Sequence, residues 1–204
     1  MRHNRSTPAF AAPLAALSLL AAACTDSPVS APLDTSLAST PAGAVAQASA
    51  AEPASSIWRV ELTPLNDSGV HGTATIEVRK GWLTVVLNAV GHEVGKTHAQ
   101  HIHGPPEGGD GSCPTAADDT DGDGLVSIAE GLPFYGGVDL PLTPFPMPTN
   151  QAGAISYKES FPVDGLSFDP ADLGLKSMVL HGRTVEGAYV GSLPVACGTV
   201  EPVN

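Results

Sequence analysis

Three histidines have the spacing of a metal site. His101 and His103 belong to "HAQHIHG", which reads as a β-strand, and alternate side chains of a strand share one face. His98 has the opposite parity, which predicts a buried structural histidine that is hydrogen-bonded to the backbone. Strand alternation in "KSMVLHGRT" turns His181 outward on a second strand. If the two strands are neighbours, the three imidazoles come together. Such a site suits copper, zinc or iron, and the affinity order of divalent metals favours Cu(II). The alternative is that His101 and His103 are surface residues without a metal.

An acidic stretch close behind them matches a calcium-binding loop. "DTDGDGLVSIAE", residues 119–130, places oxygen donors at positions 1, 3, 5, 7, 9 and 12 of an EF-hand loop, with glycine at position 6. The predicted ligands are the side chains of Asp119, Asp121, Asp123, Ser127 and Glu130 and the carbonyl of Leu125. Gly131, Leu132 and Pro133 are expected to stop a long exit helix, so we expect a structural calcium site rather than a calcium sensor. The alternative is a solvated acidic loop.

In the rest of the domain, apolar and polar residues alternate with a period of two. "WRVELTPL", "GTATIEV" and "WLTVVLNAV" each place apolar side chains on one face, and "AISYKESF", "SMVLHG" and "AYVGSLPVACGTV" fit further strands. Gly and Pro clusters separate these runs, and no long helical period interrupts them. We therefore expect an all-β domain over residues 57–204, either a β-sandwich or a Greek-key β-barrel. Residues 104–151 break the rhythm and are expected to leave the sheet as one long functional loop.

The N-terminal residues 1–24 read as a secretion signal. Arg2 and Arg5 precede the apolar run "FAAPLAALSLLAAAC", which is too short to span a bilayer. Small residues directly before Cys24 are similar to a bacterial lipoprotein signal, in which this cysteine becomes the lipidated N-terminus; the alternative is an ordinary signal with an incidental cysteine. Residues 25–56 are rich in Ala, Ser, Thr and Pro and read as a disordered tether. We expect an exported, membrane-anchored bacterial lipoprotein that faces the periplasm or the cell exterior.

The net charge and the number of cysteines indicate which partners are excluded and whether a disulfide is expected. Without the signal the chain keeps seven Lys and Arg against 21 Asp and Glu, a net charge of −14, which argues against nucleic acid as a partner. With Cys24 lipidated, Cys113 and Cys197 are the two remaining cysteines of an exported protein, and such a pair is expected to form a disulfide. Closing that loop would contribute about 4 to 5 kcal/mol in the chain-entropy model.

The order of these features resembles the copper/zinc superoxide dismutase family over most of residues 57–204. The features are "GVHGTATIE", "LTVVLNAVGHEVGKTHAQHIHG", the cysteine that follows, "VLHG" and the terminal "VACGTV". The "HAQHIHG" strand is also similar to the CHRD-type domains of exported bacterial proteins. The resemblance implies a Greek-key β-barrel, and it assigns His101, His103 and His181 to copper, His98 to the structural histidine, and Cys113 with Cys197 to the intramolecular disulfide.

The chain departs from that family at two places. No histidine lies between Gly104 and Leu180, where the family has its bridging histidine and further zinc ligands. The arginine that precedes Ala-Cys-Gly in the family and guides superoxide is missing from "GSLPVACG". We therefore expect no zinc site, and we expect calcium to organise the long loop in place of zinc.

Three functions fit these predictions. A copper site of three histidines, cycling between Cu(II) and Cu(I), could disproportionate superoxide if it is exposed and keeps an open coordination position. The same domain could bind metal without catalysis, as a scaffold that has lost the bridging ligand and the arginine. A zinc lyase or hydrolase comes third, because three imidazoles and a water also form catalytic zinc sites but no general base is evident. The leading hypothesis is an exported, dismutase-like copper-binding protein.

Overall fold

A computed structural model describes residues 55–104 and 109–204 of the chain. The chain divides into Met1–Ala48 and Ser49–Asn204, and all described residues belong to the second unit. The predicted signal peptide, the lipidation site Cys24 and nearly all of the predicted tether lie outside the described residues. None of the helices in the described part of the chain has the length and hydropathy of a membrane span.

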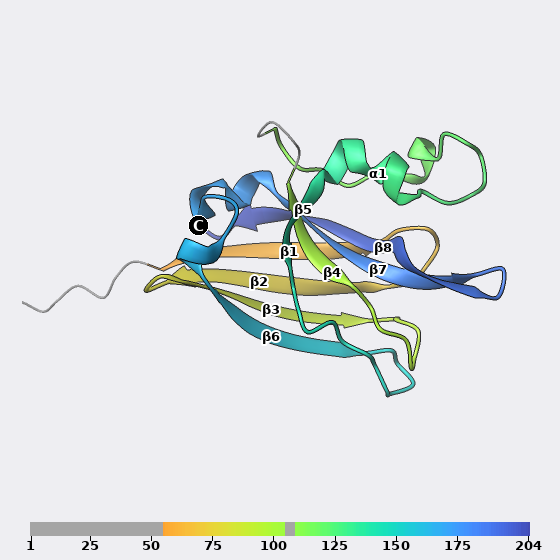
Figure 1. Cartoon of the computed structure of the whole chain (residues 1–204), viewed down its shortest axis with the longest axis horizontal. Coiled ribbons are helices and arrows are strands. Elements are labelled where there is room, and N and C mark those ends of the chain that lie inside the picture. The colour runs from red at the N-terminus through yellow and green to blue at the C-terminus, as the bar shows by residue number, and fades with distance from the viewer. Residues whose placement is uncertain (1–54, 105–108) are drawn as a thin grey trace, which may run out of the picture. The chain divides into compact units, whose positions relative to one another are not determined.

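Eight antiparallel strands form one curled sheet, a half-barrel (Figure 1). The strand order is β5-β4-β7-β8-β1-β2-β3-β6, so β5 and β6 are the two edges of the sheet. The all-β prediction is correct, although the hydrogen-bonded ladder does not close between these two edges into a complete barrel. The strands are β1 (Ser56–Pro64), β2 (His71–Arg79), β3 (Trp82–Val90), β4 (Gln100–Gly104), β5 (Gly137–Pro141), β6 (Ile155–Pro162), β7 (Ser177–Val185) and β8 (Ala188–Pro202).

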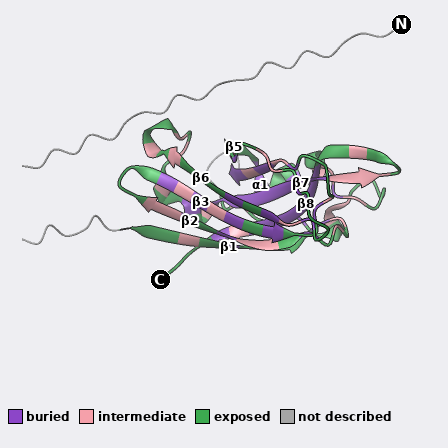
Figure 2. Ribbon diagram, turned by 90° about the horizontal axis from the view of Figure 1, so that it is seen from below, coloured by how far each residue is buried: buried purple, intermediate pink, exposed green. Residues whose placement is uncertain are grey.

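The core lies on the concave side of the half-barrel and is built from alternating strand residues. In β3 every second side chain is buried, and Leu83, Val85 and Leu87 are fully inaccessible. The β1, β2 and β3 strands show buried positions alternating with exposed ones, as Figure 2 shows along the ribbons. Each such aliphatic side chain contributes about 1.5 to 3 kcal/mol when it is fully buried.

Strands β4 and β7 differ because both of their faces are covered. All six residues from Ser177 to Gly182 are buried, and so are four of the five residues of β4. One face packs on the common core, and a layer made by the segment between β4 and β6 covers the other. In Figure 1 the helix of that layer, α1 (Ile128–Tyr135), lies on the side of β7 and β8.

The segment 104–151 is more structured than predicted. It contains the short 3-10 helix η1 (Ala116–Asp118), helix α1 and the strand β5, which pairs with β4 and therefore returns the chain to the sheet. The prediction that the whole segment leaves the sheet is wrong. Strand β5 has only five residues, too few to show a clear alternation of apolar and polar residues in the sequence. Two further 3-10 helices, η2 (Val163–Gly165) and η3 (Pro170–Leu175), connect β6 to β7.

The exit helix α1 is short, as expected, but it ends after Pro133 rather than at it. Pro133 lies inside the helix, which ends at Gly136, where φ is 74°. The helix starts with a capping box in which Ser127 Oγ accepts from the Glu130 N–H and the Glu130 carboxylate accepts from the Ser127 N–H. Burial of Tyr135 at its last turn explains why a helix with a proline in its second half persists.

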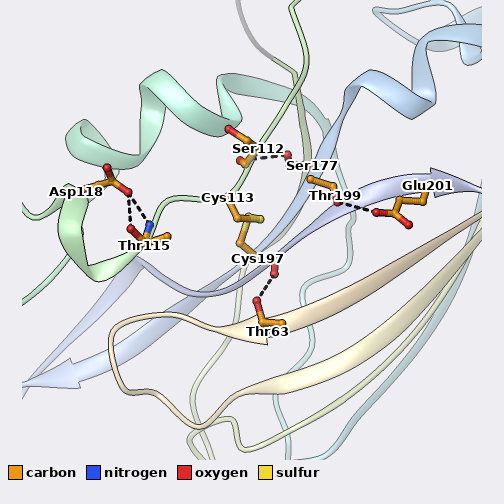
Figure 3. The surroundings of a disulfide bond; sticks show 9 residues. All are labelled: Thr63, Ser112, Cys113, Thr115, Asp118, Ser177, Cys197, Thr199 and Glu201. Atoms are coloured by element: carbon orange, nitrogen blue, oxygen red, sulfur yellow. Dashed lines mark hydrogen bonds between the residues drawn. A yellow bond between two sulfur atoms is a disulfide. The ribbon is translucent and has the colours of Figure 1, made fainter.

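A disulfide between Cys113 and Cys197 ties the covering layer to β8. It closes a separation of 84 residues in the chain, with Cα atoms 5.7 Å apart (Figure 3). Cys197 is fully buried and packs in one small apolar cluster with Leu65, Tyr135 and Val179. The Thr63 hydroxyl donates to the Cys197 carbonyl at 3.2 Å, so β1 also holds this point (Figure 3). A disulfide of this kind is typical of an extracellular or periplasmic domain.

Candidate metal centre

The three predicted histidine ligands meet between β4 and β7. These strands pair in a register that sets His101 opposite Val179 and His103 opposite Ser177. In the pairing of β7 with β8, the register shifts on both sides of His181, so this residue departs from the regular strand pairing. One ring nitrogen of each of the three histidines lies within 4.8 Å of the others, which is the separation that a single metal ion can bridge. We call these residues the histidine triad.

Backbone carbonyls fix the orientation of two of the rings. The Nδ1–H of His103 donates to the Gly136 carbonyl at 3.0 Å, and the Nδ1–H of His181 donates to the Ser192 carbonyl at 2.8 Å. Because a carbonyl only accepts, both rings carry their proton on Nδ1 and leave Nε2 as a free lone pair. This is the outer hydrogen bond by which proteins orient metal-binding histidines.

Each ring of the histidine triad has one buried nitrogen without a hydrogen-bond partner. These atoms are Nε2 of His103, Nε2 of His181 and Nδ1 of His101. Buried polar atoms are nearly always paired, so three unpaired nitrogens at one place need an explanation. Coordination of one metal ion would satisfy all three, and the residues present therefore fit a metal.

The histidine site is buried, which corrects the expectation that His181 faces outward and leaves the exposure required by the catalytic hypothesis unmet. His103 and His181 are each 4 % exposed, and only His101 is partly accessible. Burial lowers the pKa of His101 to about 4 and that of His181 to about 3, and it is also the main cause of the lowered pKa of His103. The prediction missed this because His181 was placed on an outward face, whereas α1 and its neighbours cover that face. All three imidazoles are neutral at neutral pH, the form that binds metal.

A cavity of about 310 Å³ opens above the histidine triad. Apolar side chains surround it, and Phe145 lies edge-on to the His101 ring, with centroids 5.4 Å apart. Tyr135 is likewise edge-on to His103, at 4.9 Å. The lining consists of the triad with Ala99, Ile128, Leu132, Tyr135, Gly136, Gly137, Val138, Phe145, Gly191 and Ser192.

His98 lies behind the triad and is 1 % exposed. Its Nδ1 lies 3.1 Å from the His181 carbonyl and its Nε2 lies 2.9 Å from the Glu93 carbonyl. The ring thus connects the backbone of a triad residue to the loop after β3, which is the backbone-bonding role that the strand parity predicted. The Glu93 carboxylate in turn accepts from the N–H and the hydroxyl of Thr184 on β7.

Other groups named by the sequence do not join the site. Arg183 follows His181 by two residues but does not line the cavity. His71 is exposed and its Nδ1 donates to the Gly69 carbonyl at 2.9 Å, while His92 is buried beside His98. Among the described residues, neither of them belongs to a group that could hold a metal ion.

The acidic loop gathers three of its predicted ligands. One carboxylate oxygen of each of Asp119, Asp121 and Asp123 lies within 4.8 Å of the others, and we call these residues the aspartate triad. Asp119 accepts from the Gly122 and Gly124 N–H groups, both at 2.8 Å, and each of these glycines has a positive φ that permits the turn. The aspartates are mostly exposed, in contrast to the histidines.

Glu130, at the twelfth position, lies outside the aspartate triad in this structure. Its carboxylate accepts from the Thr120 N–H at 2.7 Å, the Thr120 hydroxyl at 2.8 Å and the Ser127 N–H at 2.8 Å. These hydrogen bonds, above all the one from Ser127, lower the pKa of Glu130 to about 2. Glu130 therefore closes the loop by hydrogen bonding, and Leu125 and Ser127 lie between it and the aspartates along the chain.

Asn66 is a site residue that the sequence did not reveal. Its side-chain amide donates to the Val126 carbonyl at 3.0 Å and accepts from the Val126 N–H at 2.7 Å, as a neighbouring strand would. The same amide nitrogen donates to the Pro194 carbonyl on β8 at 2.9 Å. Asn66 thus fixes the acidic loop to the sheet across a separation of 60 residues. The only available signal was an asparagine in a turn, "NDSG", which is common everywhere.

Helix α1 connects the two triads. Glu130 in its first turn closes the acidic loop, and Tyr135 at its end contacts His103. The next residue, Gly136, supplies the carbonyl that orients the same histidine. One short helix therefore has contacts with the acidic loop at its start and with His103 at its end.

Comparison with known proteins assigns no family. No protein-family model matches the chain, and no curated protein matches it. The chain thus has a histidine triad and an aspartate triad on a β half-barrel, and the resemblance to superoxide dismutases rests on the motifs alone.

Proposed function

We propose that this chain is an exported, lipid-anchored, dismutase-like copper-binding protein with a structural calcium site. The observation that carries the proposal is the set of three buried, unpartnered imidazole nitrogens that converge from β4 and β7. His101, His103 and His181 would hold the ion, and the Gly136 and Ser192 carbonyls would orient two of the rings. Copper is favoured over zinc because the affinity order for imidazole sites peaks at Cu(II).

The strand order supports the Greek-key part of the resemblance. Strands β1, β2 and β3 are consecutive and paired, and β8 returns from far along the chain to lie beside β1. The connections from β3 to β4 and from β6 to β7 join strands that are not neighbours in the sheet. Such crossing connectivity distinguishes a Greek-key fold from an up-and-down barrel. Together with the histidine triad and the disulfide, it favours a superoxide dismutase-type scaffold.

Bound copper would supply redox cycling between Cu(II) and Cu(I), which is the chemistry that disproportionation of superoxide requires. The residues around the histidine triad are poorly suited to rapid superoxide dismutation. No described residue that lines the cavity is charged, so nothing there attracts an anion. The nearby charge of Asp139, which only partly offsets the burial that lowers the pKa of His103, would repel one. We therefore propose slow dismutation at most, and the uncharged lining favours the alternative of a non-catalytic, CHRD-like metal-binding domain.

Calcium is proposed for the acidic loop, with the aspartate triad as the first ligands and Leu125, Ser127 and Glu130 as the remaining predicted ones. Hard carboxylate oxygens at this spacing suit calcium. Calcium titration by calorimetry should give binding, and a chelator should make residues 109–136 more sensitive to protease. Absence of both effects would contradict the proposal.

Copper loading tests the histidine site. The purified chain should retain close to one copper after dialysis, and a His101→Ala/His103→Ala variant should lose it, because a single imidazole remains. His71→Ala is the matched control, since His71 is an exposed histidine outside the triad. Preferential retention of zinc, or equal copper retention by the double variant and the parent, would refute the copper assignment. The rate at which the copper-loaded protein consumes superoxide then distinguishes a catalytic function from a non-catalytic one.

Membrane anchoring is tested at Cys24. Replacement by serine removes the thiol that a lipid would occupy, so the Cys24→Ser protein should leave the membrane fraction while the parent chain stays in it. Equal distribution of both proteins would argue for an ordinary signal.

A further inference from the structure

The cavity above the histidine triad is surrounded by exposed apolar side chains. Ile128 is 42 % exposed, Leu132 45 % and Val138 52 %, and all three line this one cavity. They are three of the ten large apolar side chains that are exposed in the described part of the chain. Scattered apolar residues on a surface need no explanation, but a group of them around a hollow marks a binding site.

Two neighbouring elements supply this rim. Ile128 and Leu132 are one turn apart on α1, so they share a face of the helix, and Val138 lies on the edge strand β5. Phe145 and Tyr135 form deeper apolar walls against the rings of His101 and His103. The Tyr135 hydroxyl lies 3.4 Å from the Ile128 carbonyl, to which it donates. The polar groups at the floor are therefore chiefly the imidazoles.

Charge near the cavity does not favour an ion. No Asp, Glu, Lys or Arg is among the described lining residues. Asp139, whose charge acts on His103, does not line the cavity and is paired with Lys176 at 2.7 Å. An anion or a cation would lose hydration on entry without finding a compensating partner other than the metal. The lining therefore offers no charged partner to an ion and mainly apolar surface to a ligand.

We propose that the cavity binds an uncharged, largely apolar small molecule with one donor atom, which completes the coordination of the metal held by the histidine triad. This inference rests on the proposed function and deepens it by naming the ligand class. A volume of about 310 Å³ is at the lower end of the range for small-molecule pockets. An aromatic ring joined to a nitrogen or oxygen donor group has the matching chemistry, with the donor toward the imidazoles and the ring between Phe145, Leu132 and Val138.

The test compares three probes on the copper-loaded full chain: 4-phenylimidazole, imidazole and azide. Binding is followed by the copper absorption and electron paramagnetic resonance spectra, at a mildly alkaline pH where both imidazoles are uncharged. We expect 4-phenylimidazole to bind at least about tenfold more tightly than imidazole, because its phenyl group is removed from water against the rim. Equal binding of the two imidazoles, or tighter binding of azide than of either, would overturn the proposal.

Variants at the rim locate the effect. Leu132→Ser and Val138→Ser should each reduce the preference for 4-phenylimidazole several-fold, and both positions are exposed, so the fold should tolerate the change. Val94→Ser is the matched control, because Val94 is 49 % exposed but does not line the cavity. An unchanged preference in both rim variants would show that the phenyl group binds elsewhere and would also overturn the proposal.

A metal-free readout separates this inference from the copper assignment. If the chain retains no copper, the proposed function fails, and methyl NMR spectra of the metal-free protein then decide about the cavity. Addition of 4-phenylimidazole should shift the methyl signals of Ile128, Leu132 and Val138 and leave those of Val94 unchanged. Absence of these shifts would overturn the inference independently of any metal.

Discussion

Histidines with the same side chain have different roles in this molecule because of what their second nitrogen contacts. His103 and His181 give one nitrogen to a carbonyl and keep the other free, whereas both nitrogens of His98 face carbonyls. The first arrangement leaves one nitrogen without a protein partner and so available to a metal, and the second leaves neither nitrogen without one. Sequence spacing separated His98 from the triad by parity alone, and the hydrogen bonds supply the physical reason.

At the same scale, Asn66 is predicted to control calcium affinity without touching the ion. Asn66→Gly keeps the positive φ of 56° at this position but removes both hydrogen bonds to Val126. Each lost bond is worth about 1 kcal/mol, or about fivefold in affinity, so calcium affinity measured by calorimetry should fall between about fivefold and about thirtyfold. Asn150→Gly is the control, since Asn150 makes the same pair of bonds to Ala154 away from the acidic loop. Equal affinity of the Asn66 variant and the parent would contradict the anchoring role.

His92 is predicted to make the stability of the domain depend on pH. It is 4 % exposed, and burial, assisted by repulsion from His98, lowers its pKa from 6.5 to about 4. Between these values the unfolded chain binds a proton that the folded chain does not, so the free energy of unfolding decreases as the pH falls from about 6.5 to about 4. Urea unfolding of metal-free His92→Phe protein should show a weaker pH dependence over this window than the parent. An identical slope would mean that other groups, such as those of the histidine triad, account for it.

At the scale of elements, α1 sets helix propensity against packing at Gly131. Glycine inside a helix is unfavourable by about 1 kcal/mol relative to alanine, so propensity alone favours Gly131→Ala. A Cβ at this position would overlap the ring of Tyr135, which is 1 % exposed. We expect packing to win, with a loss of about 1 to 3 kcal/mol in the free energy of unfolding and weaker copper retention. Gly174→Ala, where nothing lies near the new Cβ, should be neutral, and a stabilised Gly131 variant would contradict this account.

The elements also show how far the sequence could predict this structure. Alternation correctly predicted β1, β2, β3, β6, β7 and β8, because one face of each pairs apolar residues with a continuous core. Strand β5 and helix α1 gave no periodic signal, since five and eight residues are too few and Pro133 contradicts the helix. The sequence analysis assumed that the strands of His101 and His181 are neighbours. Strands β4 and β7 do pair, so His181 meets His101 and His103 as expected. Burial of these histidines was not predicted, because it depends on α1, which covers them from a segment that was expected to be a loop.

At the scale of the whole molecule, one covering layer serves both proposed metal sites. The layer contains the acidic loop and α1, which lies on the side of β7 and β8 (Figure 1), and β5 continues from it into the sheet by pairing with β4. It is held to the half-barrel by Asn66 at the loop, by the pairing of β5 with β4 at the edge, and by the disulfide between them. The sheet provides the histidines, and the layer provides their burial and the orientation of His103.

The disulfide is therefore predicted to affect the copper site as well as stability. Loss of a crosslink between residues 84 positions apart removes about 4 to 5 kcal/mol in the chain-entropy model, a large fraction of the 5 to 15 kcal/mol of a typical domain. Cys197 and Tyr135 share one apolar cluster, so freeing Cys113 loosens the helix that orients His103. Urea unfolding of the Cys113→Ala/Cys197→Ala variant should show this loss, and its copper should dissociate faster. Reduced wild-type protein is the matched control because it keeps both side chains; if it unfolds and releases copper as the oxidised protein does, the crosslink does not hold the layer in place.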